Sequence, residues 1–324
     1  MKEKINYSLK DISVIIATYN RYGDLAITIN SFKKYVSSLK EVIIIDQSTN
    51  DLTKETVKEL RERNIKYFHS KTPSLTLARN LGVDKSSKKA KITLFLDDDV
   101  FIGRGYFEGI LEVFNVEKGV VGVAGHYFQN IKVNRFANFA RKIFLIEHRQ
   151  KNSVNVYSPY GASYPTILTK TINASWLPGF NMAFKKEVFE TNKFDENFFK
   201  YGLGEDFEFT TRLNKKYPNS LFITPFAKIV HRVSEAERMP KPKLVYMNHV
   251  NKLYIQKKNF NTFEGIVSTG IALLIISIMH LFIAISNPTN KNLLKCGMHF
   301  KSLFYCLRRL NLIRKGDLTI PSNV

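Results

Sequence analysis

Three short apolar runs rich in β-branched residues constrain the fold of this chain more than any other feature of its sequence. They are residues 12–17 (ISVIIA), 42–45 (VIII) and 92–96 (ITLFL). None alternates apolar with polar side chains, which is typical of strands buried on both faces of a parallel sheet. The sequence between them predicts one more strand at 65–69 and helices at about 24–38, 52–63 and 74–83. Strands that alternate with helices in this order predict a right-handed parallel α/β sheet.

Acidic residues follow the predicted strands where these end. Asp46 follows the second run, and Asp97, Asp98 and Asp99 follow the third. Ligands of such sheets bind beyond the carboxyl ends of the strands, so residues 17–20 should lie at the same edge. Adjacent carboxylates repel one another, and burial of a carboxylate is costly unless it is paired or binds a cation. Two carboxylates spaced i, i+2 can bind Mg²⁺ or Mn²⁺, although a solvated acidic turn would have the same sequence.

Two other segments carry residues with candidate chemistry. Asp206 opens a helix predicted at 204–213, whose N-terminus would favour the charge of a general base. Simple helix capping by Glu205 and Asp206 explains the same pattern. In residues 77–82 (LARNLG), Arg79 and Asn80 could contact phosphate or ribose near a helix start, or Arg79 could be an exposed helix residue.

The pattern is weaker between residues 113 and 232, which predicts a mixed region that completes one domain. We expect a strand at 120–123, a basic and aromatic helix at 134–149 and a polar loop at 152–171. Two apolar segments, 176–184 and 221–230, frame the helix predicted at 204–213.

Residues 266–286 (IVSTGIALLIISIMHLFIAIS) are almost entirely apolar. As a helix they would reach about 30 Å, the thickness of the hydrocarbon core of a bilayer. A buried core helix is the alternative. Residues 293–307 are too charged for an ordinary second span and favour an amphipathic interfacial helix at about 293–310. A re-entrant hairpin with its turn at 287–292 would keep every basic cluster on the cytoplasmic side, as the positive-inside rule favours over a single crossing.

The net charge of +21 predicts a polyanionic partner, which could be nucleic acid, anionic lipid or a phosphorylated substrate. From Lys228 onward, fifteen Lys or Arg residues face four acidic residues and bracket the apolar segment. This position favours anionic membrane lipids over nucleic acid. The two cysteines, Cys296 and Cys306, form neither a disulfide framework nor a zinc pattern, and the N-terminal residues lack the apolar run of a signal peptide.

Taken together and in this order, the motifs resemble those of the family 2 glycosyltransferases of the GT-A fold. SVIIATYNR resembles the first strand and nucleotide-binding turn, and IIIDQSTNDLT the second strand with its base-binding Asp. LARNLGV is similar to the ARNxG segment and FLDDDV to the metal-binding DxD strand. LPGFNMAF resembles the acceptor segment, and GEDFEFTTRL the segment with the catalytic base. The resemblance covers residues 11–232, with two departures: Gln47 replaces a common Asp, and Phe180 replaces a common Gly.

The resemblance implies transfer of a sugar from a nucleotide-sugar donor, in the first instance a UDP-sugar, with inversion at the anomeric carbon. The acceptor would be lipid-linked or another glycan, and the pathway would make a polysaccharide or glycoconjugate. We expect a catalytic domain at 1–240 and a basic tail at 241–324, with the catalytic domain on the cytoplasmic side of the cell membrane. No Arg precedes Trp176 as in the QxxRW signature of processive synthases, so we expect transfer of a single sugar.

The resemblance also implies a role for each site residue. Asp206 would be the base, and Asp97, Asp99 and His231 would bind Mn²⁺ or Mg²⁺, although a surface histidine at a strand end is the alternative for His231. Donor contacts are expected at Ala17, Thr18, Tyr19, Arg21, Asp46, Arg79, Asn80, Asp97 and Asp98. Acceptor contacts are expected at Trp176, Gly179, Phe180, Asn181 and Glu205, where Trp176 could instead be a residue at the core edge.

Two rival functions remain compatible with parts of the sequence. A basic nucleic-acid-binding protein would explain the charge, and it would need basic residues interleaved with aromatic ones on one face. A catalytically inactive, membrane-bound sensor of nucleotide sugars would explain the motifs. The retention of Asp97, Asp99 and Asp206 argues against the sensor.

Overall fold

The structure is a computed structural model, and its described residues are 6–127, 148–150, 154–156, 158–165, 167–237 and 239–322. The chain divides into two compact units. The first comprises residues 1–131, 151–153 and 165–238, and the second comprises residues 132–150, 154–164 and 239–324.

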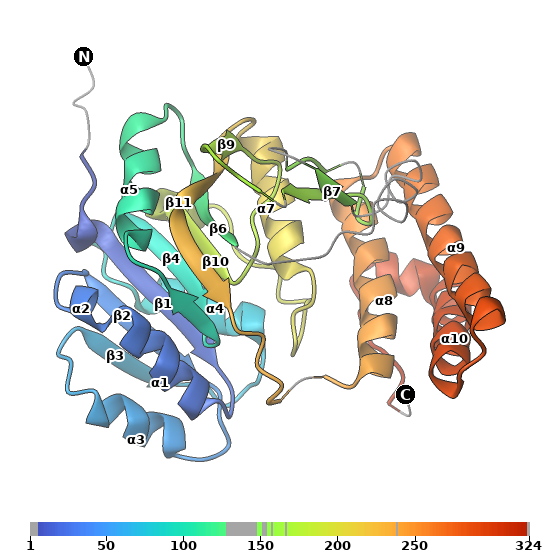
Figure 1. The fold of residues 1–324 in the computed structure, drawn as a ribbon, viewed down its shortest axis with the longest axis horizontal. Coiled ribbons are helices and arrows are strands. Elements are labelled where there is room, and N and C mark those ends of the chain that lie inside the picture. The colour runs from blue at the N-terminus through green and yellow to red at the C-terminus, as the bar shows by residue number, and fades with distance from the viewer. Residues whose placement is uncertain are drawn as a thin grey trace. The chain divides into compact units, whose positions relative to one another are not determined.

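A mixed nine-stranded sheet forms the first unit (Figure 1), with the strand order β3-β2-β1-β4-β10-β6-β11-β5 and with β9 paired to β11. The strands β1 to β4 are parallel, which confirms the predicted parallel sheet for this part. The remainder is mixed, because β10 is antiparallel to β4 and β6 while β11 is parallel to β6 and antiparallel to β5. The strands are β1 (Ile12–Thr18), β2 (Glu41–Asp46), β3 (Ile65–His69), β4 (Ile92–Asp97), β5 (Val100–Ile102), β6 (Gly122–Tyr127), β9 (Ile172–Asn173), β10 (Asn181–Lys185) and β11 (Leu221–His231).

The helices of the first unit pack on both faces of the sheet. They are α1 (Tyr22–Ser31), α2 (Lys33–Val36), α3 (Leu52–Glu59), α4 (Leu75–Lys85), α5 (Tyr106–Val116) and α7 (Glu205–Lys216). On one face, Val14 and Ile16 of β1 share a core with Phe32 and Phe107. On the other face, α4 approaches β1 so closely that a Cβ on Gly82 would lie 2.4 Å from Ile15 Cγ2.

Several predicted element bounds need correction. The helix predicted at 24–38 is interrupted at Phe32, whose backbone is not helical (φ −124°, ψ 17°) and whose side chain is buried in the core. The helix predicted at 52–63 ends at Glu59, and the strand predicted at 120–123 is β6, which starts at Gly122. The sequence did not predict α5 or β5.

The middle of the chain is described only in part. The helix predicted at 134–149 lies outside the described residues, except that 148–150 form a strand, so the helix prediction is wrong for 148 and 149. This strand, β7 (His148–Gln150), pairs with β8 (Ser163–Pro165), which lies within the loop predicted at 152–171.

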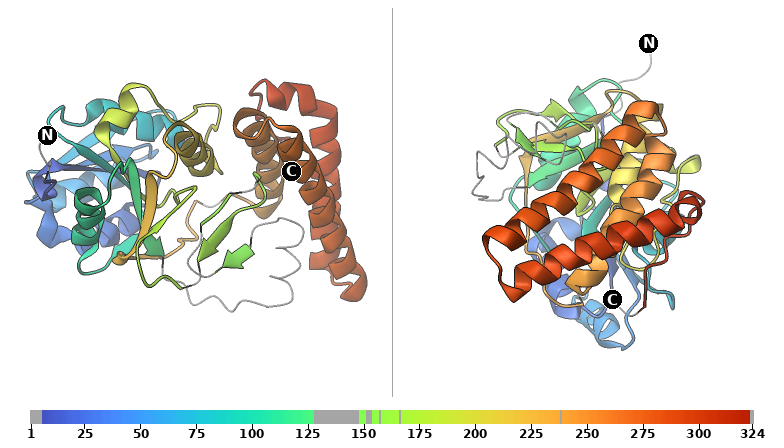
Figure 2. Two further views of the ribbon diagram at one scale, coloured as in Figure 1. Left: turned by 90° about the horizontal axis from the view of Figure 1, so that it is seen from above. Right: turned by 90° about the vertical axis from the view of Figure 1, so that its right-hand side faces the viewer.

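In the part of the second unit that the structure describes, three helices pack against one another (Figure 2): α8 (Lys241–Asn259), α9 (Phe263–Ser286) and α10 (Asn290–Arg314). The sequence did not predict α8. The helix predicted at 266–286 is α9, and the one predicted at 293–310 is the longer α10. Among the described residues, only α9 is long and apolar enough to cross a membrane. Small residues of α9 are buried, including Gly265, Ala272 and Ser277, whereas large ones such as Phe282 and Ile285 are exposed.

Candidate active site

The three aspartates lie where β4 ends and the chain turns into β5. Because β5 pairs with the end of β11, Val100 lies opposite His231, and the Arg232 N–H donates to the Asp99 carbonyl at 2.8 Å. This pairing brings His231 to the acidic turn from a point more than 130 residues later in the chain. Asp97, the last residue of β4, and Asp99, in the turn, both lie near the histidine.

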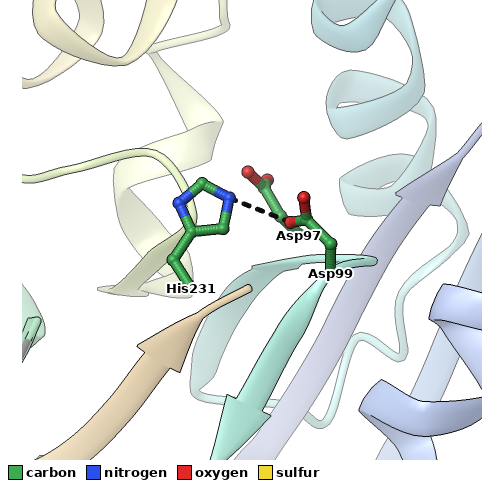
Figure 3. Close-up of side chains that lie close together, drawn as sticks. All are labelled: Asp97, Asp99 and His231. Carbon is green, nitrogen blue, oxygen red and sulfur yellow. Dashed lines mark ion pairs between the residues drawn. The ribbon is translucent and has the colours of Figure 1, made fainter. Parts of the chain in front are cut away.

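Asp97, Asp99 and His231 form a candidate metal site (Figure 3). One ligand atom from each lies within 4.8 Å of the others, and His231 Nε2 is 2.9 Å from Asp99 Oδ1. Burial opposes ionisation of Asp99, but its hydrogen bonds with His231 and the Ser234 N–H outweigh burial and lower its pKa. Two carboxylates and an imidazole are a donor set that fits Mn²⁺, and the two carboxylates alone would suit Mg²⁺.

Aromatic rings hold the imidazole of His231. Phe180 stacks on it, with ring centroids 4.8 Å apart and an angle of 18° between the planes. Tyr127 contacts both rings edge-on, at 5.1 Å from Phe180 and 6.2 Å from His231. The Phe180 carbonyl accepts a hydrogen bond from the Asp97 N–H. Phe180 stands where the family pattern commonly has a glycine. Its side chain packs against His231, and its carbonyl binds the Asp97 N–H, so it contacts two of the candidate metal ligands.

Asp98 turns away from this cluster and is buried. Its carboxylate accepts a hydrogen bond from the Thr18 hydroxyl at 2.7 Å and pairs with Arg21 at 3.2 Å. Burial raises the pKa of Asp98 to about 7, although Arg21 and Thr18 favour the charged form. The Arg21 guanidinium also donates twice to the carbonyl of Ala236. The side chains of Thr18, Arg21 and Asp98 thus bind one another or the Ala236 carbonyl, whereas Ala17 and Tyr19 of the same turn are partly exposed.

Asp46 ends β2 next to Thr18 of β1 and is fully buried. Its carboxylate accepts hydrogen bonds from the Tyr67 hydroxyl at 2.7 Å and from the Ser48 N–H at 2.9 Å. The neighbouring Gln47 donates to the Thr72 and Ser74 carbonyls and accepts from the Ser74 N–H. Gln47, the other departure from the family pattern, therefore holds the loop that leads into α4.

Asp206 lies in the first turn of α7, where two backbone N–H groups donate to its carboxylate. These are Gly179 to Oδ2 and Phe207 to Oδ1, both at 2.7 Å. Gly179 approaches so closely that a Cβ there would lie 2.8 Å from the Cβ of Asp206. Glu205 beside it is buried, and burial, helped by the charge of Asp206, raises the pKa of Glu205 to about 8 against the opposing effect of Arg79.

Arg79 and Asn80 are neighbours in α4 but have different surroundings. Arg79 lies among Glu205, Asp97 and the Gly179 carbonyl. The Asn80 amide instead donates to the Phe194 carbonyl and to Glu196, and it accepts from the Phe194 N–H. The structure therefore brings Arg79 to the acidic cluster, whereas the contacts of Asn80 are with the 194–196 segment. The expected contact of Asn80 with the donor stays a prediction.

Two of the expected acceptor residues lie in the protein interior or at its edge. The Asn181 side chain is fully buried, and its Oδ1 accepts from the Gly125 N–H and the Tyr106 hydroxyl. Its expected contact with the acceptor stays a prediction. Trp176 is partly exposed, and its ring lies 5.7 Å from that of Phe207. Sequence reasoning missed Tyr127 and Ser234 at the site, because neither belongs to a local motif.

Comparison with known proteins relates this chain to glycosyltransferases. The family model described as Glycosyl transferase family 2 matches residues 13–192. A chondroitin synthase of Escherichia coli is 27% identical over 225 residues, which cover 63% of this chain and 32% of that protein. The GalNAc(5)-diNAcBac-PP-undecaprenol beta-1,3-glucosyltransferase of Campylobacter jejuni is 26% identical over 196 residues, which cover 58% of this chain and 56% of that protein. The chain thus matches about a third and about half of the length of these two relatives.

A solved structure has a similar fold. It is the mannosyltransferase of Pyrobaculum calidifontis in complex with GDP-Man and Mn²⁺, with a TM-score of 0.55 and 12% sequence identity. The match covers 93% of this chain and 87% of that one. At this identity the similarity concerns the fold alone.

Proposed function

Because the chain is a member of glycosyl transferase family 2 and has the GT-A fold, we propose that it transfers one sugar from a nucleotide-sugar donor to a lipid-linked or other glycan acceptor, with inversion. The observation that carries this proposal is that Arg79 contacts both Asp97 of the candidate cation site and Glu205, the residue next to Asp206. A carboxylate suited to proton transfer and a candidate cation site thereby belong to one connected cluster.

Asp97, Asp99 and His231 would bind the divalent cation, for which Mn²⁺ is the first candidate. A bound cation would neutralise charge on the leaving diphosphate. The turn around Ala17 and Tyr19 would contact the nucleotide, with Asp46 at the base. UDP-sugars are the first donors to test, and GDP-sugars the second, because the structurally similar mannosyltransferase was solved with GDP-Man.

Asp206 would accept the proton of the acceptor hydroxyl as its oxygen attacks the anomeric carbon. A general base needs an oxygen with a free lone pair within hydrogen-bond reach of that hydroxyl. The N–H groups of Gly179 and Phe207 hold the carboxylate from two directions, and each carboxylate oxygen can accept more than one hydrogen bond. These bonds fix the direction of the side chain.

The tail would bring the enzyme to a membrane that contains anionic lipids. The exposed large apolar side chains of α9 form a surface typical of membrane or protein contact. Small residues on its buried side are typical of helix packing within membranes. We propose that α9 and α10 enter as a hairpin with its turn after Ser286, which leaves the basic clusters at 257–258 and 308–315 on the cytoplasmic side. The relative in Campylobacter jejuni is named for a lipid-linked substrate, which supports a lipid-linked acceptor here.

The test is a donor screen with the purified full chain in lipid nanodiscs, with Mn²⁺, UDP- and GDP-sugars, and polyprenyl-diphosphate-linked acceptors. Asp206→Asn should keep donor binding but lower turnover by about 100-fold or more, because an amide cannot accept the proton. The matched control is Asp84→Asn, an exposed carboxylate on α4 that should leave turnover unchanged. Donor binding without transfer by the wild type would instead support a sensor, and salt-sensitive DNA binding without donor binding would support a nucleic-acid-binding protein.

A further inference from the structure

Arg79 contacts groups at both ends of the site. One nitrogen, Nη1, binds the Glu205 carboxylate at 2.5 Å, immediately before the proposed base. The other, Nη2, lies 3.3 Å from Asp97 Oδ1, a proposed metal ligand, and donates to the Gly179 carbonyl at 3.0 Å. The side chain is only 3% exposed, and its guanidinium lies over the ring of Phe194. Its terminal nitrogens are thus directed at protein groups.

The contact with Gly179 connects Arg79 to the base through one residue. The Gly179 carbonyl accepts from Arg79, while the Gly179 N–H donates to Asp206 Oδ2. Both polar groups of this residue are therefore engaged, one with the guanidinium and one with the base. Because Gly179 also touches the Asp206 side chain, a displacement of this residue would displace the carboxylate.

The charges explain why an arginine suits this position. Glu205 and Asp206 are consecutive, and Asp97 approaches from β4, so three carboxylates surround the guanidinium. Buried carboxylates need a nearby positive charge, and a planar guanidinium can serve several acceptors at fixed angles. A lysine has the same charge but no planar fork of donors. It cannot hold the geometry of Glu205, Asp97 and Gly179 together.

We propose that Arg79 is a positioning residue for this reaction, which holds the base Asp206 through Gly179 and Glu205 at a set distance from the metal ligand Asp97. This inference rests on the proposed function and replaces the expected contact of Arg79 with the donor. In this role Arg79 aligns the acceptor hydroxyl with the donor, and it does not contribute to the affinity for the donor.

The test separates turnover from donor affinity in Arg79→Lys and Arg79→Met. We expect kcat at saturating donor and acceptor to fall about 100-fold, because a misplacement of about 1 Å can cost this much. The Kd for UDP or GDP with Mn²⁺, measured by calorimetry, should change less than about threefold, since the binding of the donor does not depend on the base. The matched control is Arg212→Lys. Arg212 forms a similar fork with Glu208 in the same helix, α7, but does not contact the acidic cluster.

A loss of nucleotide affinity as large as the loss of turnover would overturn the proposal and make Arg79 a donor ligand. If Arg79→Met does not fold, Glu205→Gln weakens one contact of Arg79 at nearly the same volume. It should lower kcat with an unchanged Kd, and unchanged kcat would overturn the proposal. If the wild type shows no transfer, the proposed function fails. A crystal structure of Arg79→Lys then still tests whether Arg79 positions Asp206. Displacement of Asp206 from the Gly179 N–H supports the positioning role, and an unmoved Asp206 excludes it.

Discussion

The contact between Gly179 and Asp206 predicts that Gly179→Ala impairs the enzyme through the position of the base. A methyl group there would lie 2.8 Å from the Asp206 Cβ and 3.0 Å from Oδ2, whereas ordinary contact begins at 3.4 Å. The aspartate would therefore have to move by about 0.6 Å. Gly179 does not have a positive φ, so alanine fits its backbone and the effect comes from the side chain alone.

The expected size of the effect follows from this displacement. At about 100-fold in rate for 1 Å, a shift of about 0.6 Å lowers kcat by about 10- to 30-fold. This corresponds to about 1.4–2 kcal/mol in the activation free energy. The added methyl group should also lower the free energy of unfolding by about 1–3 kcal/mol, as overpacking does.

The assay compares kcat at saturating substrates, donor Kd and unfolding by denaturant in Gly179→Ala and in the control Gly23→Ala. A Cβ at Gly23, in α1, meets nothing within 4 Å. This control should keep its turnover and gain up to about 1 kcal/mol of stability by restricting the unfolded chain. If Gly179→Ala is folded and keeps more than half of the turnover of the wild type, Asp206 either is not held by Gly179 or is not the base.

Three further predictions concern the metal, the buried carboxylate and the tail. Asp99→Ala should weaken the Mn²⁺-dependent affinity for a nucleoside diphosphate by at least about 10-fold in calorimetry, because it removes a proposed ligand, and unchanged affinity would exclude the metal assignment. The pKa of Asp98 is raised from 3.8 to about 7, so this group stabilises the fold fully below pH 4 and loses that contribution as the pH rises to 7. The wild type should therefore lose up to about 4 kcal/mol of unfolding free energy between pH 4 and 8, and Asp98→Asn should not show this loss. The same pH dependence of the unfolding free energy in both proteins would contradict the raised pKa of Asp98. For the tail, a single cysteine at position 322, with Cys296 and Cys306 replaced, should react with an impermeant reagent only after cells are permeabilised. Labelling of intact cells would refute the hairpin and support a single crossing.

Local patterns in the sequence were sufficient for the elements that form the edge of the sheet. The apolar runs that became β1, β2 and β4 have a composition that only strands buried on both faces explain well. The parallel arrangement then brings the first residues after them to one edge, which is why the sequence alone is enough to locate Asp46 and Asp97 there. The sequence patterns did not predict a helix whose packing surface is interrupted by charged residues. The many lysines of α8 obscure its helical spacing, yet Tyr246, Val250 and Ile255 are buried.

The partners of the site residues were decided by tertiary structure. Arg79 and Asn80 are adjacent in the sequence, but helical geometry directs them about 100° apart, so one reaches the acidic cluster and the other reaches Phe194. Asp97 and Asp98 likewise face opposite ways, and only the return of β11 determines that His231 lies beside the turn. A sequence specifies which chemical groups a chain carries and the local direction of each. Which groups meet depends on contacts between segments that are far apart along the chain, and these contacts are formed by the packing of the whole sheet.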